Sequence, residues 1–466
     1  MDSDIEHRGE WWLPENPEKR FYGTLTFNQA SGAVLELDGA FTDDPDNSEL
    51  FNPHIVNGTS STGIDITLCN CLGKGLSVYW GGQSISKLHA HDVYIGVHFK
   101  KEDEIKFRSV RVIYSQLDTW LGISGFKTKR RKTKRGKDEI VIRYTLPESV
   151  TAFISNELQL SIDYGSSFSP YAWREADLKQ SCGATFLPVE KLAFEEYRDI
   201  IRQFQNFLSL ATTTYVYPMR IEGTPDIDFY KDSDKVTVGN YTYAQPVEIL
   251  YQLARSPQTD RMSYSTDYLF TFKSISNRFG KYLQSWFGKY ELLKPVHQLY
   301  FGTLYNPTMY LDQKFLAFIQ ALEAYHRRTI GNCELPNEKH KERIKQILDS
   351  VTTKYMEWLK AKLDYSNEPS LRKRLKELLK SNEALTSQLT SSGKQFINDV
   401  CNTRNYLIHY DLELEDKAAK GEELHNLTQK LKVLIEACFL KQLGFNSQKV
   451  TKILSNYYRR YSFFGQ

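Results

Sequence analysis

Residues Gly393 to Tyr410 read GKQFINDVCNTRNYLIHY, and their apolar side chains recur at the spacing of an α-helix. The expected apolar stripe consists of Phe396, Ile397, Val400, Cys401, Leu407 and Ile408. Arg404 falls within that stripe, where its permanent charge needs a partner or an opening onto a polar cleft. Asn405 and His409 are four residues apart, so they share the adjoining edge of the helix. The stretch therefore predicts a core-facing helix with three polar groups where core meets solvent.

These three side chains suit chemistry on an RNA phosphodiester. An imidazole that titrates near neutrality can move a proton to or from a ribose hydroxyl, and a guanidinium can hold a phosphate through two hydrogen bonds. Neither role needs a metal ion or a cofactor, so none is expected. The alternative is a surface helix that carries Arg404, Asn405 and His409 by chance, because the R-x4-H spacing alone is common in long chains.

The hexapeptide from Arg404 to His409 (RNYLIH) resembles the R-N-x-x-x-H signature of the HEPN ribonucleases. The resemblance covers about residues 306–445, and Leu316–Arg328 (LAFIQALEAYHRR) is similar to the first helix of the ApeA-like HEPN branch. Trp11–Phe41 (WWLPENPEKRFYGTLTFNQASGAVLELDGAF) is similar to the start of the N-terminal domain of ApeA-type anti-phage proteins. Two regions in the expected order make the match more specific than the hexapeptide alone.

The resemblance implies a metal-independent endoribonuclease. His409 would be the general acid or base, Arg404 would stabilise charge on the phosphate, and Asn405 would orient one of them or bind the phosphate. Attack by the 2′-hydroxyl would leave a 2′,3′-cyclic phosphate and confine the enzyme to RNA. In this family two copies of the motif commonly meet across a dimer, so we expect a homodimer through the HEPN domain.

The family also implies a role in anti-phage defence by abortive infection. The N-terminal region would be a sensor that restrains the nuclease until a phage-derived trigger, expected to be a protein, is present. The enzyme would then cleave host RNA, of which tRNA is one candidate. The rival interpretation is a non-catalytic HEPN module that binds RNA or a protein partner.

Composition favours a cytoplasmic globular protein. The 466 residues are 41% hydrophobic and 13% aromatic, which is enough for two or three domains with proper cores. The net charge of +3 is small, so any nucleic-acid footprint must be local. Six irregularly spaced cysteines and an N-terminus without an apolar run argue against secretion and disulfides. Because no stretch approaches the ~20 apolar residues that span a bilayer, no membrane contact is expected.

Apolar residues recur first at the two-residue spacing of strands and later at the spacing of helices, which predicts an α+β chain with three parts. Residues 1–187 read as a β-rich sandwich or barrel, because short β-branched and aromatic runs alternate with turn residues. These runs are residues 24–27, 33–37, 63–68, 91–99, 107–114 and 140–144. Residues 188–305, with a helix around Tyr197 to Leu208 and a strand at 235–238, read as completion of that module and a connector. Residues 306–466 read as the HEPN helical bundle.

We expect the bundle to be up-and-down, with four long helices around residues 311–325, 344–359, the motif helix and 427–438. The charged segment 371–389 should form a more exposed fifth helix. If the first and third helices lie together, Glu323 is a candidate ion-pair partner for Arg404. His326 lies on the apolar face of the first helix, where a hydrogen-bonded core histidine is expected in preference to a second catalytic residue.

Further residues at the helix ends are candidates for supporting roles. Tyr410 and Asp411 follow His409, and the Asp411 carboxylate would either raise the pKa of the imidazole or cap the helix end. Arg327 and Arg328 would guide RNA, although the end of a helix attracts basic residues in any case.

Two features of the β-rich part have open interpretations. Cys69 and Cys71 alternate onto one strand face, as do His89 and His91, so four zinc ligands could meet, although buried thiols are common in cores. The run from Phe126 to Lys137 (FKTKRRKTKRGK) lies between two predicted strands. It is either a solvated hairpin loop or an RNA-contacting segment, the candidates for RNA binding being Lys129, Arg130, Arg131 and Lys132.

Overall fold

The computed structural model describes residues 5–41, 51–77, 85–169, 176–238, 241–253 and 267–464. The chain forms two compact units, one of residues 1–266 and 271–280, the other of residues 267–270 and 281–466. The first is β-rich and the second is helical, so the predicted α+β class is confirmed. The segment 188–305 contributes to both units. Within the described ranges, no helix combines the length and the apolar character needed to cross a membrane.

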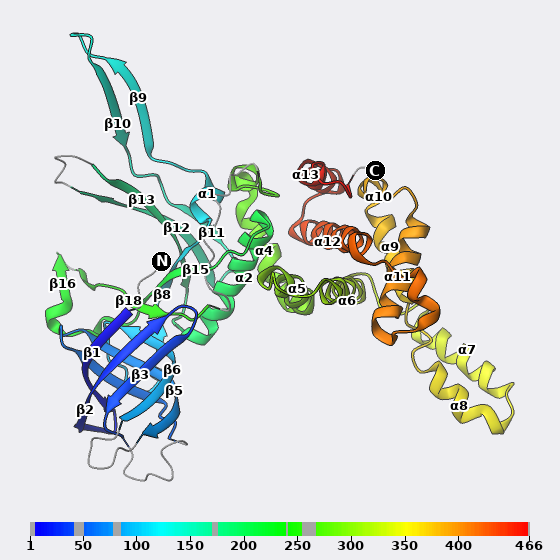
Figure 1. The fold of residues 1–466 in the computed structure, drawn as a ribbon, viewed down its shortest axis with the longest axis horizontal. Helices are drawn as coiled ribbons and strands as arrows, with labels where there is room; N and C mark the ends of the chain where they lie inside the picture. The colour runs from blue at the N-terminus through cyan, green and yellow to red at the C-terminus, as the bar shows by residue number, and fades with distance from the viewer. Residues whose placement is uncertain are drawn as a thin grey trace. The chain divides into compact units, whose positions relative to one another are not determined.

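Six strands at the start of the chain close into a barrel (Figure 1). They are β1 (Ile5–Leu13), β2 (Asn16–Asn28), β3 (Gly32–Asp38), β4 (Ile55–Ser60), β5 (Asp65–Ser77) and β6 (Ile85–Ile95). Their order is β6-β3-β2-β1-β4-β5, and β5 pairs again with β6. Alternate side chains, among them Trp11, Leu35 and Leu68, fill the interior. Of the two architectures predicted from the short, closely spaced runs, a sandwich or a barrel, this part of the chain forms the barrel.

Beyond β6 the same sheet continues as an open layer. Its strands are β18 (Val247–Leu250), β15 (Pro218–Thr224), β8 (Ser109–Tyr114), β13 (Leu178–Pro188), β12 (Leu158–Phe168) and β11 (Val150–Phe153). Helix α2 (Phe194–Thr212) buries Tyr197, Phe204 and Leu208 in this unit. The Tyr114 hydroxyl donates to the Ile201 carbonyl at 3.0 Å, and its ring meets Phe204 edge to face. The helix predicted around Tyr197 to Leu208 is confirmed.

Short elements complete the first unit. They are β7 (Lys106–Phe107), α1 (Leu117–Leu121), β14 (Leu192–Ala193), β16 (Lys235–Val238), β17 (Tyr241–Ala244) and α3 (Phe272–Ile275). Helix α4 (Phe279–Gly288) begins at the boundary of the two units.

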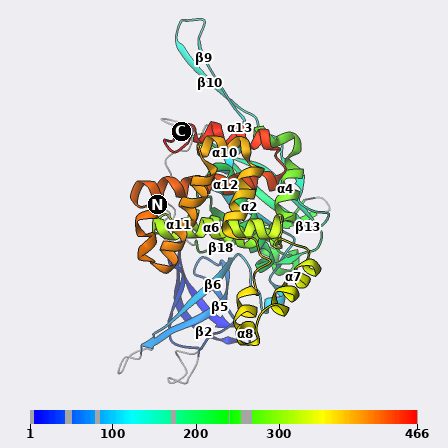
Figure 2. The ribbon, with the colours of Figure 1, turned by 90° about the vertical axis from the view of Figure 1, so that its right-hand side faces the viewer.

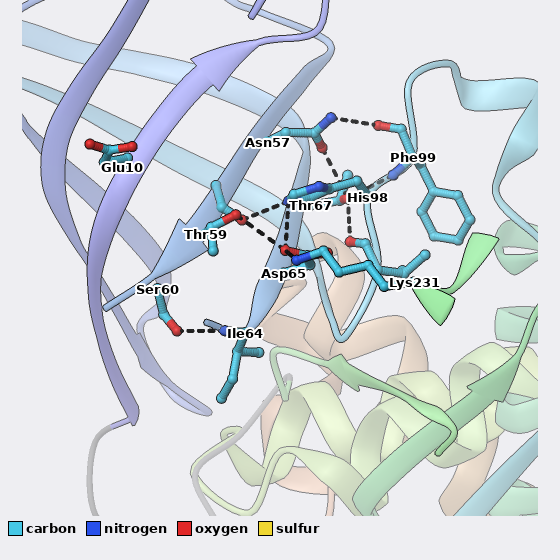
Figure 3. Close-up of polar contacts among 12 residues, drawn as sticks. Glu10, Asn57, Thr59, Ser60, Ile64, Asp65, Thr67, His98, Phe99 and Lys231 are labelled. Atoms are coloured by element: carbon cyan, nitrogen blue, oxygen red, sulfur yellow. Dashed lines mark hydrogen bonds and ion pairs between the residues drawn. The ribbon is translucent and has the colours of Figure 1, made fainter. Parts of the chain in front are cut away.

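A buried polar cluster fastens loops to one part of the barrel (Figure 3). The Thr67 hydroxyl accepts from the Phe99 amide at 3.0 Å, and the Asn57 amide donates to the Phe99 carbonyl at 3.0 Å. Asp65 accepts from the Thr59 hydroxyl at 3.1 Å and from the Lys231 ammonium at 2.7 Å. Because each of these polar side chains has a partner, the cluster is structural.

The basic run forms a strand, not a loop between strands. Strand β9 (Phe126–Lys132) pairs with β10 (Asp138–Tyr144) in a separate two-stranded sheet, which extends away from the rest of its unit (Figures 1 and 2). Of the run 126–137, which was interpreted as lying between two strands, only residues 133–137 form the turn of the hairpin, and residues 126–132 are themselves a strand. These residues are exposed on both faces of the ribbon, so no hydrophobic period marks them as a strand.

The helical unit contains the remaining elements. They are α5 (Tyr290–Tyr305), α6 (Leu311–Thr329), α7 (Asn337–Asp349), α8 (Thr353–Leu363), α9 (Leu371–Ser381), α10 (Glu383–Leu389), α11 (Gly393–His409), α12 (Gly421–Leu443) and α13 (Ser447–Tyr458). Helix α6 packs against α5, α9 and α12, and α9 packs against α11.

Two segments of the helical unit differ from the prediction in which of them is buried. The helix expected over 344–359 is divided between α7 and α8, which pack on each other, and neither helix buries a residue. The segment expected to be exposed supplies α9, where Leu375, Leu378 and Leu379 are buried. The many charged residues of α9 led to the prediction of an exposed helix. Its narrow apolar stripe is nevertheless enough to place α9 between α6 and α11.

Candidate active site

Helix α11 carries the polar motif at its last turn. The Ser392 hydroxyl caps its first turn by accepting from the Gln395 amide at 3.2 Å. The buried stripe runs through Phe396, Val400 and Thr403, and Arg404 lies half-buried beside it. Ile408 was expected to face the core but is 44% exposed, because the last turn extends beyond the part of α11 that is buried.

The three motif side chains lie on the accessible part of this turn. Arg404 donates from Nη1 to Oδ1 of Asn405 at 3.2 Å. His409 is exposed and makes no hydrogen bond or ion pair with any residue that the structure describes. The end of α11 therefore carries a guanidinium in contact with an amide, and an imidazole that has no partner among the described residues.

Glu323 lies on α6 in the neighbourhood of this helix, but it forms no ion pair with Arg404 among the described residues. Burial raises the pKa of the Cys401 thiol, Arg372 and Arg404 oppose that rise, and Glu323 adds to it. Glu323 and Arg404 are thus both near Cys401 without meeting. Arg404 instead turns along the helix surface toward Asn405.

Two further cations near the motif were not identified from the sequence. Arg372, at the start of α9, donates to the Asn398 side chain of α11. Lys420 lies over the Tyr406 ring, with its ammonium 5.8 Å from the ring centroid, and pairs with Glu415 at 3.3 Å. Both come from other elements, so spacing within the motif helix contains no signal for them.

Tyr410 and Asp411 end the motif helix and begin the next turn. Tyr410 has a φ of 51°, in the left-handed region, and its ring contacts that of Tyr406 at 5.8 Å. The Asp411 carboxylate accepts from the Glu413 amide at 3.0 Å and so caps the short 3-10 helix that follows. Of the two roles considered for Asp411, the structure shows a cap, of the next helix and not of α11.

Comparison with known families identifies two domains in the chain. The model described as Apea-like HEPN matches residues 316–449, which include most of α6 and all of α9 and α11. The model described as ApeA N-terminal domain 1 matches residues 6–286, more than half of the chain. The chain belongs to the ApeA family. No curated protein and no solved structure matches it significantly. Membership indicates an anti-phage defence effector that carries a HEPN module.

In this ApeA family member, His326 is a buried structural histidine, as expected. Its Nε2 lies 2.7 Å from Glu377, and its Nδ1 lies 3.2 Å from the Arg374 guanidinium. Because a guanidinium can only donate, Nδ1 accepts and Nε2–H donates to the carboxylate. Arg374 is itself buried and also donates to the Pro369 carbonyl at 2.9 Å and to the Asn332 side chain at 2.6 Å.

The predicted RNA-binding residues of this ApeA family member lie on the surface, some held by contacts to neighbouring residues and others exposed. Arg327 pairs with Glu368, and Arg328 donates to the Leu292 carbonyl at 3.0 Å, so both contribute to packing at the end of α6. Lys129, Arg130 and Lys132 of β9 are exposed, and Arg131 pairs with Glu139 on β10.

The four zinc-ligand candidates of this chain do not converge. In the register of β5 and β6, Cys69 lies opposite Asp92 and Cys71 lies opposite Ala90. Both thiols therefore share the inward face with those residues. His89 and His91 occupy the alternate positions of β6 and point to the other face. Burial raises the pKa of the Cys71 thiol to about 12, which fits a buried core thiol.

Proposed function

We propose that this protein is a metal-independent endoribonuclease whose active site is the last turn of α11. The observation that supports the proposal most directly is that Arg404, Asn405 and His409 lie within the last six residues of α11. Arg404 contacts Asn405, and His409 is exposed and free of partners within the described residues. In RNA cleavage by an internal nucleophile, an imidazole can transfer the protons and a guanidinium can stabilise the charge on the phosphate.

In the proposed mechanism His409 takes the proton from the ribose 2′-hydroxyl, or gives a proton to the leaving 5′-oxygen. Arg404 holds the phosphate and stabilises the negative charge that grows on its oxygens, while Asn405 orients the guanidinium through the contact described above. The products are a 2′,3′-cyclic phosphate and a 5′-hydroxyl. Arg372 and Lys420 would add positive charge beside the site.

A homodimer is part of the proposal. Large apolar side chains follow one another at the end of α11, where Ile408 is 44% exposed, Tyr410 68% and Leu412 80%. Apolar side chains grouped beside a polar site are typical of a surface that a partner covers. A second copy of the helical unit is the partner that would bring a second motif to the same place.

The β-rich unit is proposed to restrain the nuclease until a phage-derived trigger binds. An unrestrained ribonuclease would degrade the RNA of its own cell, so the proposed activity requires such control. The ApeA family membership supports this division of roles between the two units.

The test is an infection experiment with matched variants. Cells that express the wild-type chain should resist at least one phage of a panel and accumulate cleaved RNA after infection. Arg404→Ala and His409→Ala should abolish both effects. Arg343→Ala and His425→Ala, which remove the same side-chain types from exposed positions of α7 and α12, should abolish neither. Protection that persists in His409→Ala without RNA cleavage would favour the rival function, a module that binds RNA or protein.

A further inference from the structure

The positive charge of this chain is concentrated in residues 127–143, which we term the arm. The arm contains nine basic and two acidic residues, a formal charge of +7 against +3 for the whole chain. The other 449 residues together therefore carry a formal charge of −4. The basic residues are Lys127, Lys129, Arg130, Arg131, Lys132, Lys134, Arg135, Lys137 and Arg143.

The root of the arm is fixed by specific contacts. The Gln180 side chain accepts from the Gly125 amide at 2.8 Å and donates to the Ile123 carbonyl at 2.9 Å. The Phe126 and Tyr144 rings face each other across the two strands with centroids 4.8 Å apart. A Cβ at Gly125 would lie 2.1 Å from the Thr145 carbonyl oxygen, so only glycine fits there. Specific contacts therefore fix the root of the arm to the β-rich unit.

The register divides the arm into two unlike faces. On one face Lys127 lies opposite Arg143, and Lys129 lies opposite Val141, followed by the Arg131–Glu139 ion pair. We term this the cationic face. On the other face Ile140 and Ile142, which are 62% and 60% exposed, lie opposite Arg130 and Thr128. That face also carries Lys132 opposite Asp138, so its cations are interrupted by apolar and acidic side chains. The cross-strand register therefore gathers cations from both strands on the cationic face.

Lys127, Lys129 and Arg143 form no ion pair with any residue that the structure describes, and such cations on an exposed ribbon fit a polyanion. Same-face residues of a strand recur every ~6.7 Å, so the cationic face offers a line of separate contacts to successive phosphates. Neutralising them releases counterions and gives affinity without sequence readout. Residues 127–143 contain no aromatic residue, so the arm has no platform on which unpaired bases could stack.

We propose that the cationic face of the arm binds the phosphate backbone of double-helical RNA, such as a stem of the substrate. In a duplex the bases are already stacked, and side chains cannot read the deep, narrow major groove of A-form RNA, so contacts to phosphates remain. The choice of RNA over other polyanions rests on the proposed nuclease function. The binding itself requires no cleavage, so the two proposals fail separately.

The experiment measures binding by the full chain with His409→Ala as background, so that cleavage does not consume the probe. The probe is a labelled RNA duplex of about 20 base pairs, longer than the ~16 that a double-stranded RNA-binding domain spans. Fluorescence anisotropy gives the Kd at several salt concentrations between about 50 and 200 mM. A single strand of the same length and phosphatidylserine vesicles are measured in parallel.

Replacing three cations of the face, Lys127→Gln, Lys129→Gln and Arg143→Gln together, should weaken duplex binding at least ~10-fold. It should also reduce the slope of log K against log salt by ~2–3, the value for three lost phosphate contacts. A control triple, Lys100→Gln, Lys273→Gln and Arg278→Gln, removes the same charge from exposed positions elsewhere in the unit and should change Kd less than about twofold. Ile140→Thr with Ile142→Thr should likewise leave Kd unchanged.

Three results would overturn the proposal. The first is equal loss of affinity in the arm triple and the control triple, and the second is tighter binding to the single strand than to the duplex. The third is the absence of duplex binding by a folded parent, and arm-dependent vesicle binding in that case would assign the arm to a membrane surface. Circular dichroism of each variant establishes that it is folded.

Discussion

Arg404 donates its hydrogen bond to Asn405, the next residue in the chain, at 3.2 Å. Adjacent side chains of an α-helix point about 100° apart, so this contact draws the guanidinium around the helix surface and away from the core. The remaining N–H groups of Arg404 have no partner among the described residues and are left for a phosphate. The pair therefore fixes the direction in which the charge is presented.

Removing the Asn405 side chain should slow RNA cleavage about 5-fold, which corresponds to the ~1 kcal/mol that one hydrogen bond contributes. Asn405→Ala leaves Arg404 charged but free to turn, so kcat should fall while the Kd for RNA changes little. Asn402→Ala, on the same helix, is the matched control. Cleavage by Asn405→Ala at the wild-type rate in a single-turnover assay would show that the contact does not orient the guanidinium.

The buried histidine on α6 should affect stability and leave chemistry intact. His326→Leu removes the acceptor of the buried Arg374 guanidinium and the donor to Glu377, and should lower the free energy of unfolding by about 3 kcal/mol. Urea denaturation measures the change, and His425→Leu on the exposed face of α12 controls for loss of an imidazole. Cleavage per folded molecule should match the wild type. A variant that is as stable as the wild type but cannot cleave RNA would indicate that His326 belongs to the active site.

A second buried network holds the C-terminal helix of the bundle. Both carboxylate oxygens of the buried Glu436 accept from tyrosine hydroxyls, from Tyr300 at 2.7 Å and from Tyr458 at 2.8 Å. Tyr458→Phe should leave one oxygen without its donor and destabilise the protein by about 1–3 kcal/mol. Tyr365→Phe, which changes a highly exposed hydroxyl, should have no measurable effect in the same denaturation experiment. Equal stability of the two variants would contradict the role of the network.

The buried His297 should make stability depend on pH. It lies between Trp286, at 4.6 Å, and Phe439, at 5.1 Å, and burial lowers its pKa from 6.5 to about 3. Below pH 6.5 the unfolded chain therefore binds a proton that the folded chain does not, so this contribution to stability is complete above pH 6.5 and is lost as the pH falls.

His297→Phe removes that titration and retains an aromatic ring. Between pH 7 and pH 5 the free energy of unfolding of the wild type should fall by about 2 kcal/mol more than that of the variant. Urea titrations followed by tryptophan fluorescence at the two pH values supply the comparison. Parallel pH dependence in the two proteins would mean that His297 is protonated in the folded state.

The sequence predicted those features that follow from a repeated local pattern. Alternating apolar residues predicted the β-rich front part, and the helical spacing from Tyr197 to Leu208 predicted α2. The patterns failed where pairing or packing partners decide the outcome. The basic strand β9 has no buried face to give it a period, and the apolar stripe of α9 is narrow among many charges.

The candidate site was predictable only along the motif helix. The spacing of Asn405 and His409 places them on one face of α11 in any helical fold, with Arg404 about 100° around the helix from Asn405. Which neighbour each side chain meets depends on the positions of other helices, so the ion pair expected between Glu323 and Arg404 did not form and the nearby Arg372 and Lys420 were missed.

The most direct test of the central claim is the chemistry of the cleaved RNA ends. Purified wild-type protein is incubated with total RNA in EDTA, beside Arg404→Ala, His409→Ala and the control His425→Ala. We predict fragments that end in 2′,3′-cyclic phosphate from the wild type and the control, and none from the other two variants. Cleavage that requires a divalent metal ion, leaves 3′-hydroxyl ends or persists in His409→Ala would contradict an active site on the last turn of α11.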